Sequence, residues 1–241
     1  MGVFVIIRAG ALACAVAGSA AIALGGCGSS GTGGATAGTG ADRSAASLIS
    51  AMKTAVRDAT SMHLAGQLPN GGRPVALDIG VLRAGALAGT ITQGGVPLQL
   101  IGTRGQVYVK ATPAFLRELR AAAAVCAVMC GKYVQMSGSQ GSALAASLSM
   151  TSLTRSLIAG LPRFSRAGTT TVRGQSAVVL RGADGSTLDV AASGKPYPLR
   201  VVAPPGRGET VLFSHWDSVA APAAPPASQV INLSQLKAGT S

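Results

Sequence analysis

An alternation of apolar residues with small or polar ones, between residues 75 and 110, constrains the fold of this chain more than any other feature. Its first run has apolar side chains at every second position, Val75, Leu77, Ile79 and Val81. Three further runs follow at 87–92, 98–100 and 107–110, separated by turn sequences that contain glycine. Because successive side chains of a strand point to opposite faces, each run predicts a strand with one buried face. The runs and turns together predict an antiparallel meander.

Helical periodicity lies on both sides of the meander. The predicted helices cover residues 42–60, 113–128 and 144–161, the last as one or two helices, and a short strand is expected at 132–136. The C-terminal third returns to strands, which are expected at 169–173, 177–181, 187–191, 199–203 and 210–216. The order of helix, strands, helices and strands predicts the α+β class, with one long curved antiparallel sheet and helices on one of its faces.

The N-terminal 26 residues have the layout of a secretory signal peptide. Arg8 is their only charged residue, and an apolar stretch from 9 to 24 ends in small residues. This stretch is short for a membrane span, which needs ~20 residues. Residues 24–27 (LGGC) resemble the bacterial lipobox, in which signal peptidase II cuts before a cysteine that receives a diacylglyceryl group. We therefore predict a lipidated Cys27 that anchors the chain to the extracytoplasmic face of the cell membrane; the alternatives are an ordinary signal peptide and an uncleaved anchor.

The segment after the lipobox predicts a flexible tether. Residues 27–41 are rich in glycine, serine and threonine and have no hydrophobic periodicity. Residues 26–31 fit the dinucleotide-binding pattern G-x-G-x-x-G, but that motif requires a preceding strand and a following helix, and here it crosses the cleavage site. The remaining residues, 42–241, are expected to form a single domain.

The positive charge of the chain favours an anionic partner. The sequence has 20 basic and 8 acidic residues, and removal of Arg8 with the signal peptide leaves a formal charge of +11. Aromatic residues make up only 3% of the chain, which argues against the stacking platforms that single-stranded nucleic acid requires. Anionic phospholipid headgroups are a better match for an exported protein. The alternative is that the scattered arginines only form a solvated exterior.

Two cysteines remain after Cys14 leaves with the signal peptide and Cys27 is assigned to the lipid. Cys126 and Cys130 are separated by three residues, and in an oxidising compartment their simplest fate is a disulfide. A zinc site would need four ligands, whereas the two histidines of the chain are distant in sequence. A thioredoxin-like redox motif has two intervening residues, and this one has three. We predict a local structural disulfide and no metal site.

The sequence gives little support for catalysis. His215 and Asp217 would share a face if the predicted strand 210–216 included both, but no G-x-S-x-G motif supplies a nucleophilic serine. His63, at the start of a strand, is interpreted as a structural histidine. We therefore predict no catalytic residue, no cofactor and no enzymatic activity.

The order of elements and several local phrases resemble actinobacterial envelope lipoproteins of the LppX/LprG family, which have the LolA-like half-barrel fold. The phrases are residues 102–110 (GTRGQVYVK), 130–134 (CGKYV), 211–217 (VLFSHWD) and 230–233 (VINL), together with the lipobox and the tether. The resemblance implies a sheet wrapped around helices, with an apolar cavity that takes the acyl chains of lipids or glycolipids.

A sheet curled around helices would turn one set of apolar side chains toward this cavity. The candidate lipid-binding residues are Leu77, Ile79, Leu87, Ile91, Leu98, Leu100, Val107, Val109, Leu116, Leu119, Leu153 and Leu157. The expected function is to bind, and to carry, such a lipid; an envelope transporter is a further candidate partner that the sequence does not identify. The alternative is a scaffold lipoprotein whose concavity is filled by its own side chains and that has no lipid cargo.

The lipobox interpretation predicts the result of replacing Cys27. The Cys27→Ala precursor should keep its full mass or leave the membrane fraction, because it lacks the thiol that receives the diacylglyceryl group. Globomycin, which inhibits signal peptidase II, should have the same effect on the wild type. Mass spectrometry and membrane fractionation measure both. A substituted protein that stays in the membrane with the processed wild-type mass would show that the lipobox interpretation is wrong.

Overall fold

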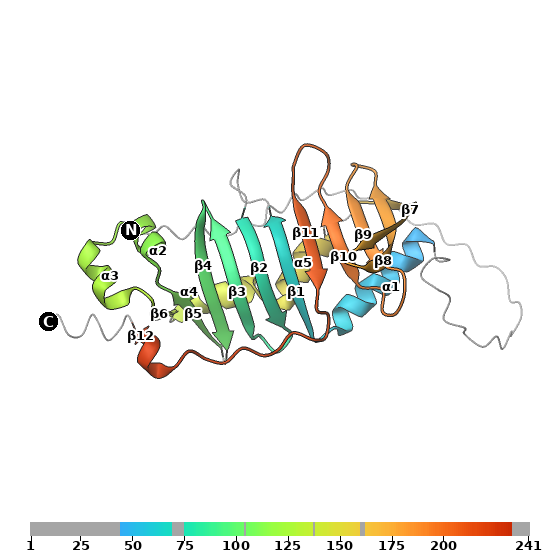
Figure 1. Cartoon of the computed structure of the whole chain (residues 1–241). Helices are drawn as coiled ribbons and strands as arrows, with labels where there is room; N and C mark the ends of the chain where they lie inside the picture. The colour runs from blue at the N-terminus through green and yellow to red at the C-terminus, as the bar shows by residue number, and fades with distance from the viewer. Residues whose placement is uncertain (1–43, 69–74, 104, 137, 160–161, 233–241) are drawn as a thin grey trace, which may run out of the picture.

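In the computed structural model, the chain forms one large, mainly antiparallel sheet with helices beside it (Figure 1). The structure describes residues 44–68, 75–103, 105–136, 138–159 and 162–232. The predicted signal peptide, Cys27 and the tether lie outside these residues. The described residues confirm the predicted α+β class.

The elements follow the chain in the order helix, strands, helices, strands. The first strands are β1 (Ser61–Leu68), β2 (Val75–Leu82), β3 (Leu87–Gln93), β4 (Val96–Thr103), β5 (Gln106–Lys110) and β6 (Tyr133–Met136). The later strands are β7 (Phe164–Val172), β8 (Gln175–Gly182), β9 (Thr187–Ala191), β10 (Pro198–Val202), β11 (Thr210–Ser214) and β12 (Val230–Asn232). The α-helices are α1 (Ala45–Asp58), α2 (Pro113–Glu118), α3 (Ala123–Met129), α4 (Gly138–Ser147) and α5 (Met150–Ala159). A short 3₁₀ helix, η2 (Ala227–Gln229), precedes β12.

The sheet is open, because its two edge strands do not pair with each other. Its order is β12-β6-β5-β4-β3-β2-β1-β11-β10-β9-β8-β7. All neighbouring pairs are antiparallel except β12 with β6, which is parallel. The first and last thirds of the chain meet where β1 pairs with β11, with Leu64 opposite Phe213. The sheet therefore joins two meanders side by side.

The structure confirms the predicted antiparallel meander and its buried face. Leu77 pairs with Ile91, and Leu100 pairs with Val109. All four side chains are at most 9% exposed, and all belong to the main hydrophobic core. Cross-strand apolar pairs on one face are the unit of sheet stabilisation, so this face needs a cover.

Helices supply that cover on one face of the sheet. In α1, Leu48, Met52 and Val56 recur every four residues and are buried, and the hydroxyl of Ser44 caps the helix by accepting a hydrogen bond from Ser47 N. This helix contacts β7 and α5, while α4 contacts β5 and α5. In Figure 1, α4 and α5 run behind the strands, and α2 and α3 lie at the opposite end of the sheet from α1.

The predicted helix 113–128 is wrong in its continuity, because it is two helices. Helix α2 ends at Glu118, and α3 begins at Ala123. Between them Arg120 has a φ of 54°, and Ala121 N donates to the carbonyl oxygen of Leu116. This left-handed residue and its hydrogen bond end α2. The alanine-rich sequence favours helix throughout, so that propensity alone gave no sign of the break.

The predicted strand 210–216 is also too long. Strand β11 ends at Ser214, and His215 and Asp217 have φ angles of 50° and 59° in the turn that follows. The chain then continues as an extended segment to β12 (Figure 1). Val219 begins this segment against Gly80 of β2, where an added Cβ would lie 2.8 Å from the Val219 side chain. The parallel strand β12 at its end was not predicted.

One glycine of the meander allows two strands to approach closely. Gly89 in β3 has a φ of 153° and is opposite Ile79. An added Cβ would overlap the carbonyl oxygen of Asp78 and lie 2.6 Å from the Cα of Ile79. Only glycine avoids this overlap with backbone atoms.

We therefore expect Gly89→Ala to lower the free energy of unfolding by about 3 kcal/mol, from backbone strain and overlap. Gly95→Ala is the matched control, because Gly95 also has a positive φ, of 80°, but has open space around its Cα. Its cost should be about 1 kcal/mol. Urea unfolding with an unchanged m value measures both. Equal losses in the two variants would contradict the close approach.

Candidate functional site

The candidate cavity residues of the strands gather on the covered face of the sheet. Their exposed fractions are Leu77 5%, Ile79 0%, Leu87 2%, Ile91 9%, Leu100 3%, Val107 1% and Val109 6%. Leu98 is partly buried and packs against the same core. From the helical side, Leu153 of α5 is 8% exposed and joins this core. The structure thus brings together the strand residues that alternation selected and one of the helical ones.

Three helical candidates are placed differently. Leu116 of α2 is buried, but it is not part of the main core. The expectation that Leu119 faces the core is wrong, because it follows the last residue of α2 and is 48% exposed. Leu157 lies in α5, but its side chain is outside the described part of the structure. Helical spacing therefore failed for Leu119, because α2 ends before that residue.

Several residues that cover the apolar face were not among the candidate lipid-binding residues. Leu148 and Met150 lie at the junction of α4 and α5 and are 1% and 2% exposed. Helix α4 itself is GSQGSALAAS, and its contribution to the core is limited to Leu144 and Ala145, which are partly buried. Strand β5, which α4 contacts, thus lies against a helix of small residues. The feature of the sequence that could have identified Leu148 and Met150 is this apolar pair between two helical segments.

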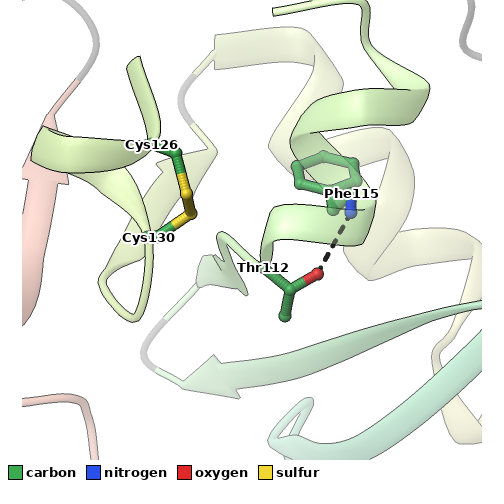
Figure 2. Close-up of a disulfide and its surroundings, with 4 residues drawn as sticks. All are labelled: Thr112, Phe115, Cys126 and Cys130. Atoms are coloured by element: carbon green, nitrogen blue, oxygen red, sulfur yellow. Dashed lines mark hydrogen bonds between the residues drawn. A yellow bond between two sulfur atoms is a disulfide. The ribbon is translucent and has the colours of Figure 1, made fainter. Parts of the chain in front are cut away.

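The predicted disulfide is present at the tip formed by α2 and α3. Cys126 lies in α3, and Cys130 follows its last residue, with Cα atoms 4.7 Å apart (Figure 2). Helix α2 begins at Pro113 with Thr112 as its cap, whose Oγ1 accepts a hydrogen bond from Phe115 N at 3.1 Å (Figure 2). No residue of α3 is buried, so the disulfide holds a helix that has little core contact. Closing so short a loop contributes about 2 kcal/mol in the chain-entropy model.

A polar cluster around Asp217 joins three distant parts of the chain. One carboxylate oxygen of Asp217 accepts hydrogen bonds from Thr60 N at 2.7 Å and Thr60 Oγ1 at 3.2 Å. The other accepts from Lys195 Nζ at 2.8 Å and Tyr197 OH at 2.6 Å. The ring of Tyr197 stacks on Trp216 at 4.4 Å between centroids, and Trp216 Nε1 donates to the carbonyl oxygen of Pro198. The cluster ties the start of β1 to the β9–β10 connection and the end of β11.

Hydrogen bonding and burial shift the pKa values of the cluster in opposite directions. The hydrogen bond from Lys195, followed by the one from Tyr197, holds the pKa of Asp217 well below its usual range. The bond to Asp217 raises the pKa of Lys195, and burial raises the pKa of Tyr197. Asp217 is therefore an ionised structural acceptor, and it is not paired with His215 as a shared strand face had implied.

His63 connects side chains of three neighbouring strands. Its Nε2 is 2.8 Å from Oδ1 of Asp78, and its Nδ1 is 3.3 Å from Oγ of Ser214. The order Ser-His-Asp matches a hydrolytic triad in composition. However, the three residues stand on regular strands, where pairing uses the backbone N–H groups that an oxyanion hole requires. Asp78 is also 73% exposed, so this arrangement fits a polar ladder across the sheet.

Two further properties concern membranes and metals. Across the described ranges, no helix is long and apolar enough to span a membrane. In the same ranges, no three His, Cys, Asp or Glu residues come together as a metal site would require.

Comparison with known proteins identifies the fold. No protein-family model and no curated protein matches the chain. Among solved structures, LprF from Mycobacterium bovis is similar, with a TM-score of 0.50 and 14% identity, over 73% of this chain and 95% of LprF. The lipoprotein LppX from Mycobacterium tuberculosis has a TM-score of 0.45 and 15% identity, over 73% of this chain and 98% of LppX. The fold that the sequence resemblance implied is therefore confirmed through LprF.

The Asp217 cluster predicts how stability depends on pH. Because its pKa is lowered on folding, Asp217 stabilises the fold above the ordinary carboxyl pKa of about 4, and this contribution is lost as the pH falls below that value. Asp217→Asn should lower the free energy of unfolding by about 2 kcal/mol at pH 7, since hydrogen bonds to a charged acceptor are lost. The difference from wild type should shrink at pH 3, as urea unfolding will show. Asp58→Asn, at the exposed end of α1, is the control and should change stability by less than about 0.5 kcal/mol. A deficit in the Asp217→Asn variant that is constant with pH would contradict the role of the charge.

Proposed function

We propose that this chain, which has the fold of LprF, is an envelope protein anchored through Cys27 that binds the acyl chains of a lipid or glycolipid against the apolar face of its sheet. The lipobox-like sequence supports the anchor, and the anchor would place the domain of residues 42–241 on the extracytoplasmic face of the cell membrane. The tether of residues 27–41 would let this domain move above the bilayer. Binding, and then carrying, a lipid is the function we assign to the domain.

The observation that carries the proposal is the single apolar face under a thin helical cover. This face extends without interruption across β1, β2 and β3, where Met62, Leu64, Ile79, Val81 and Leu87 are each at most 2% exposed. A sheet face of this kind needs only apolar contact, and acyl chains provide it as well as leucines do. Beside these strands, where α4 contacts β5, the helix covers the sheet mainly with alanine and serine, which contribute little burial of their own.

Helical side chains and an acyl chain would contribute similar free energies by covering the apolar face, so that a lipid can replace the helices there. Lifting Leu148, Met150 and Leu153 off the sheet would cost ~1.5–3 kcal/mol for each side chain. An acyl chain that buries about 12 CH₂ groups would contribute ~10 kcal/mol. A lipid that enters between the α4–α5 pair and the strands therefore offsets the loss of these three contacts. The proposed site forms by movement of these helices away from the sheet.

The scaffold alternative is favoured by a different observation. Ile79 and Leu100 are 0% and 3% exposed, so that protein atoms already surround them. In that alternative the side chains of the helices are the permanent filling of the concavity. The two functions differ in whether a lipid co-purifies with the protein from its host.

The test is native mass spectrometry of the lipoprotein purified gently from its own host. The lipid-binding function predicts a mass above that of the anchored protein, by one lipid that organic solvent extracts and tandem spectrometry identifies. A single mass without adduct, together with no uptake of a fluorescent fatty acyl probe by the extracted protein, would favour the scaffold function.

A pair of substitutions on β4 predicts where that lipid binds. Leu100→Phe adds volume to the covered face and should lower stability by ~1–3 kcal/mol through overpacking. It should also reduce the amount of co-purifying lipid, because the ring takes space that an acyl chain would occupy. Gln99→Phe is the matched control, since Gln99 is the exposed neighbour of Leu100 on the other face of the same strand.

Thermal unfolding of the delipidated proteins and the lipid content of the purified ones give the two measurements. We expect wild-type lipid content in the Gln99→Phe variant and a reduced content in the Leu100→Phe variant. An equal lipid content in both would place the lipid elsewhere than on the covered face.

A further inference from the structure

A hollow of about 290 Å³ lies between α1, α5 and the turn that joins β2 to β3. It is lined by Lys53, Val56 and Arg57 of α1, Thr151, Thr154 and Arg155 of α5, and Arg83 of the turn. Spacings of four residues place Lys53 and Arg57 on one side of α1, and Thr151 and Arg155 on one side of α5. Three elements that are far apart in the sequence thus bring four cations to one depression.

The charge of this hollow is uncompensated. Its lining includes no aspartate or glutamate, and within the described residues none of the four cations forms an ion pair. Like charges four residues apart on a helix disfavour each other, so that Lys53 and Arg57 gain nothing from their proximity. An anion in the hollow would remove this repulsion.

Two hydrogen bonds hold the Arg83 guanidinium in place and leave some of its N–H groups without a partner in these bonds. Its Nε donates to the carbonyl oxygen of Ala59 at 2.6 Å, and its Nη2 donates to that of Val56 at 3.1 Å. These bonds cap the end of α1 and fix the guanidinium at the hollow. A guanidinium has five N–H groups, so further donors are available to a ligand. The sequence analysis did not select Arg83 as a candidate site residue, because only the tertiary structure brings the β2–β3 turn next to α1.

One lining residue of the hollow, Val56, is apolar and connects the hollow with the core. Val56 lines the hollow, is 3% exposed and belongs to the same core cluster as Leu100 and Leu153. The side wall also carries hydroxyls, and Thr154 Oγ1 donates to the carbonyl oxygen of Met150 at 2.7 Å. The hollow is therefore lined mainly by cationic and hydroxyl side chains, and it touches the core at Val56.

We propose that this hollow binds a phosphate group, and that the group is the headgroup of the lipid whose acyl chains enter the core beside Val56. Arginine pairs with phosphate through two parallel hydrogen bonds. The Thr151 hydroxyl adds a neutral donor, whereas the single proton of the Thr154 hydroxyl already goes to Met150. The volume is at the lower end of the range of small-molecule sites, which begins at roughly 300 Å³, and so it suits a headgroup better than a whole lipid. The headgroup assignment depends on the proposed lipid-binding function, whereas the phosphate site itself does not.

The experiment compares three probes on the full-length lipoprotein in a non-ionic detergent. They are inorganic phosphate, dihexanoyl phosphatidic acid and dihexanoylglycerol, which has the same acyl chains without phosphate. Isothermal titration should show phosphatidic acid binding at least about tenfold more tightly than dihexanoylglycerol, since charge-assisted hydrogen bonds are gained. Added salt should weaken only the binding of the two phosphate probes.

The variant is Arg57→Gln with Arg155→Gln, which removes two cations but keeps Arg83, because Arg83 also bonds to α1. This variant should bind phosphatidic acid about 10–100-fold more weakly than wild type, with unchanged binding of dihexanoylglycerol. The matched control is Arg117→Gln with Lys132→Gln, which removes the same charge in α2 and just before β6, elements that lie away from α1 (Figure 1). Its affinity should stay within about twofold of wild type. Circular dichroism spectra like that of the wild type are the control for folding of both variants.

The outcomes separate this inference from the proposed function. Equal binding of both lipids, with no effect of Arg57→Gln and Arg155→Gln, would overturn the phosphate site and leave lipid binding intact. Arginine-dependent binding of inorganic phosphate, with no binding of either lipid, would keep the phosphate site for a free anion and overturn the lipid function. Absence of binding by all three probes would overturn both.

Discussion

The burial of one face of an open sheet is the constraint on which the rest of this structure depends. In the described part of the chain, twelve strands pair in a row without closing, so that the sheet cannot bury its apolar face against itself. Helices α1, α4 and α5 meet this need, and the main core is the contact between them and the strands. The edges are protected by simple means, since β12 has three residues and β7 has a register shift between Arg166 and Gly168.

The two meanders meet where β1 pairs with β11, and polar contacts stabilise this border in addition to the core. Asp217 binds Thr60 at the start of β1 and both Lys195 and Tyr197 before β10. Arg83 joins the β2–β3 turn to the last carbonyl groups of α1. Both contacts lie where α1 leads into β1, so the chain reversal there is fixed from two sides. The hollow between α1 and α5 is lined in part by the same fixed elements, which gives it a defined shape.

The functional inferences follow from the same separation of apolar and charged surfaces. The sheet presents an apolar face that any acyl chain can satisfy, and α4 covers part of it with small residues. Four cations gather between α1, α5 and the β2–β3 turn, beside Val56. An amphiphile with a phosphate headgroup matches both surfaces at once. The excess of basic residues, which in the sequence is spread along the chain, therefore becomes partly local in the fold.

The sequence by itself determined the local structure and the class of fold. Alternation at 75–110 selected the buried residues of β2 to β5 because the side chains of a strand alternate regardless of what covers them. The cysteine spacing likewise indicated the disulfide. Tertiary structure alone decided the rest: the break after Glu118, the turn at His215, the exposure of Leu119 and the meeting of Lys53, Arg83 and Arg155. These features depend on contacts between residues distant in sequence, and no local pattern encodes which helix lies beside which turn.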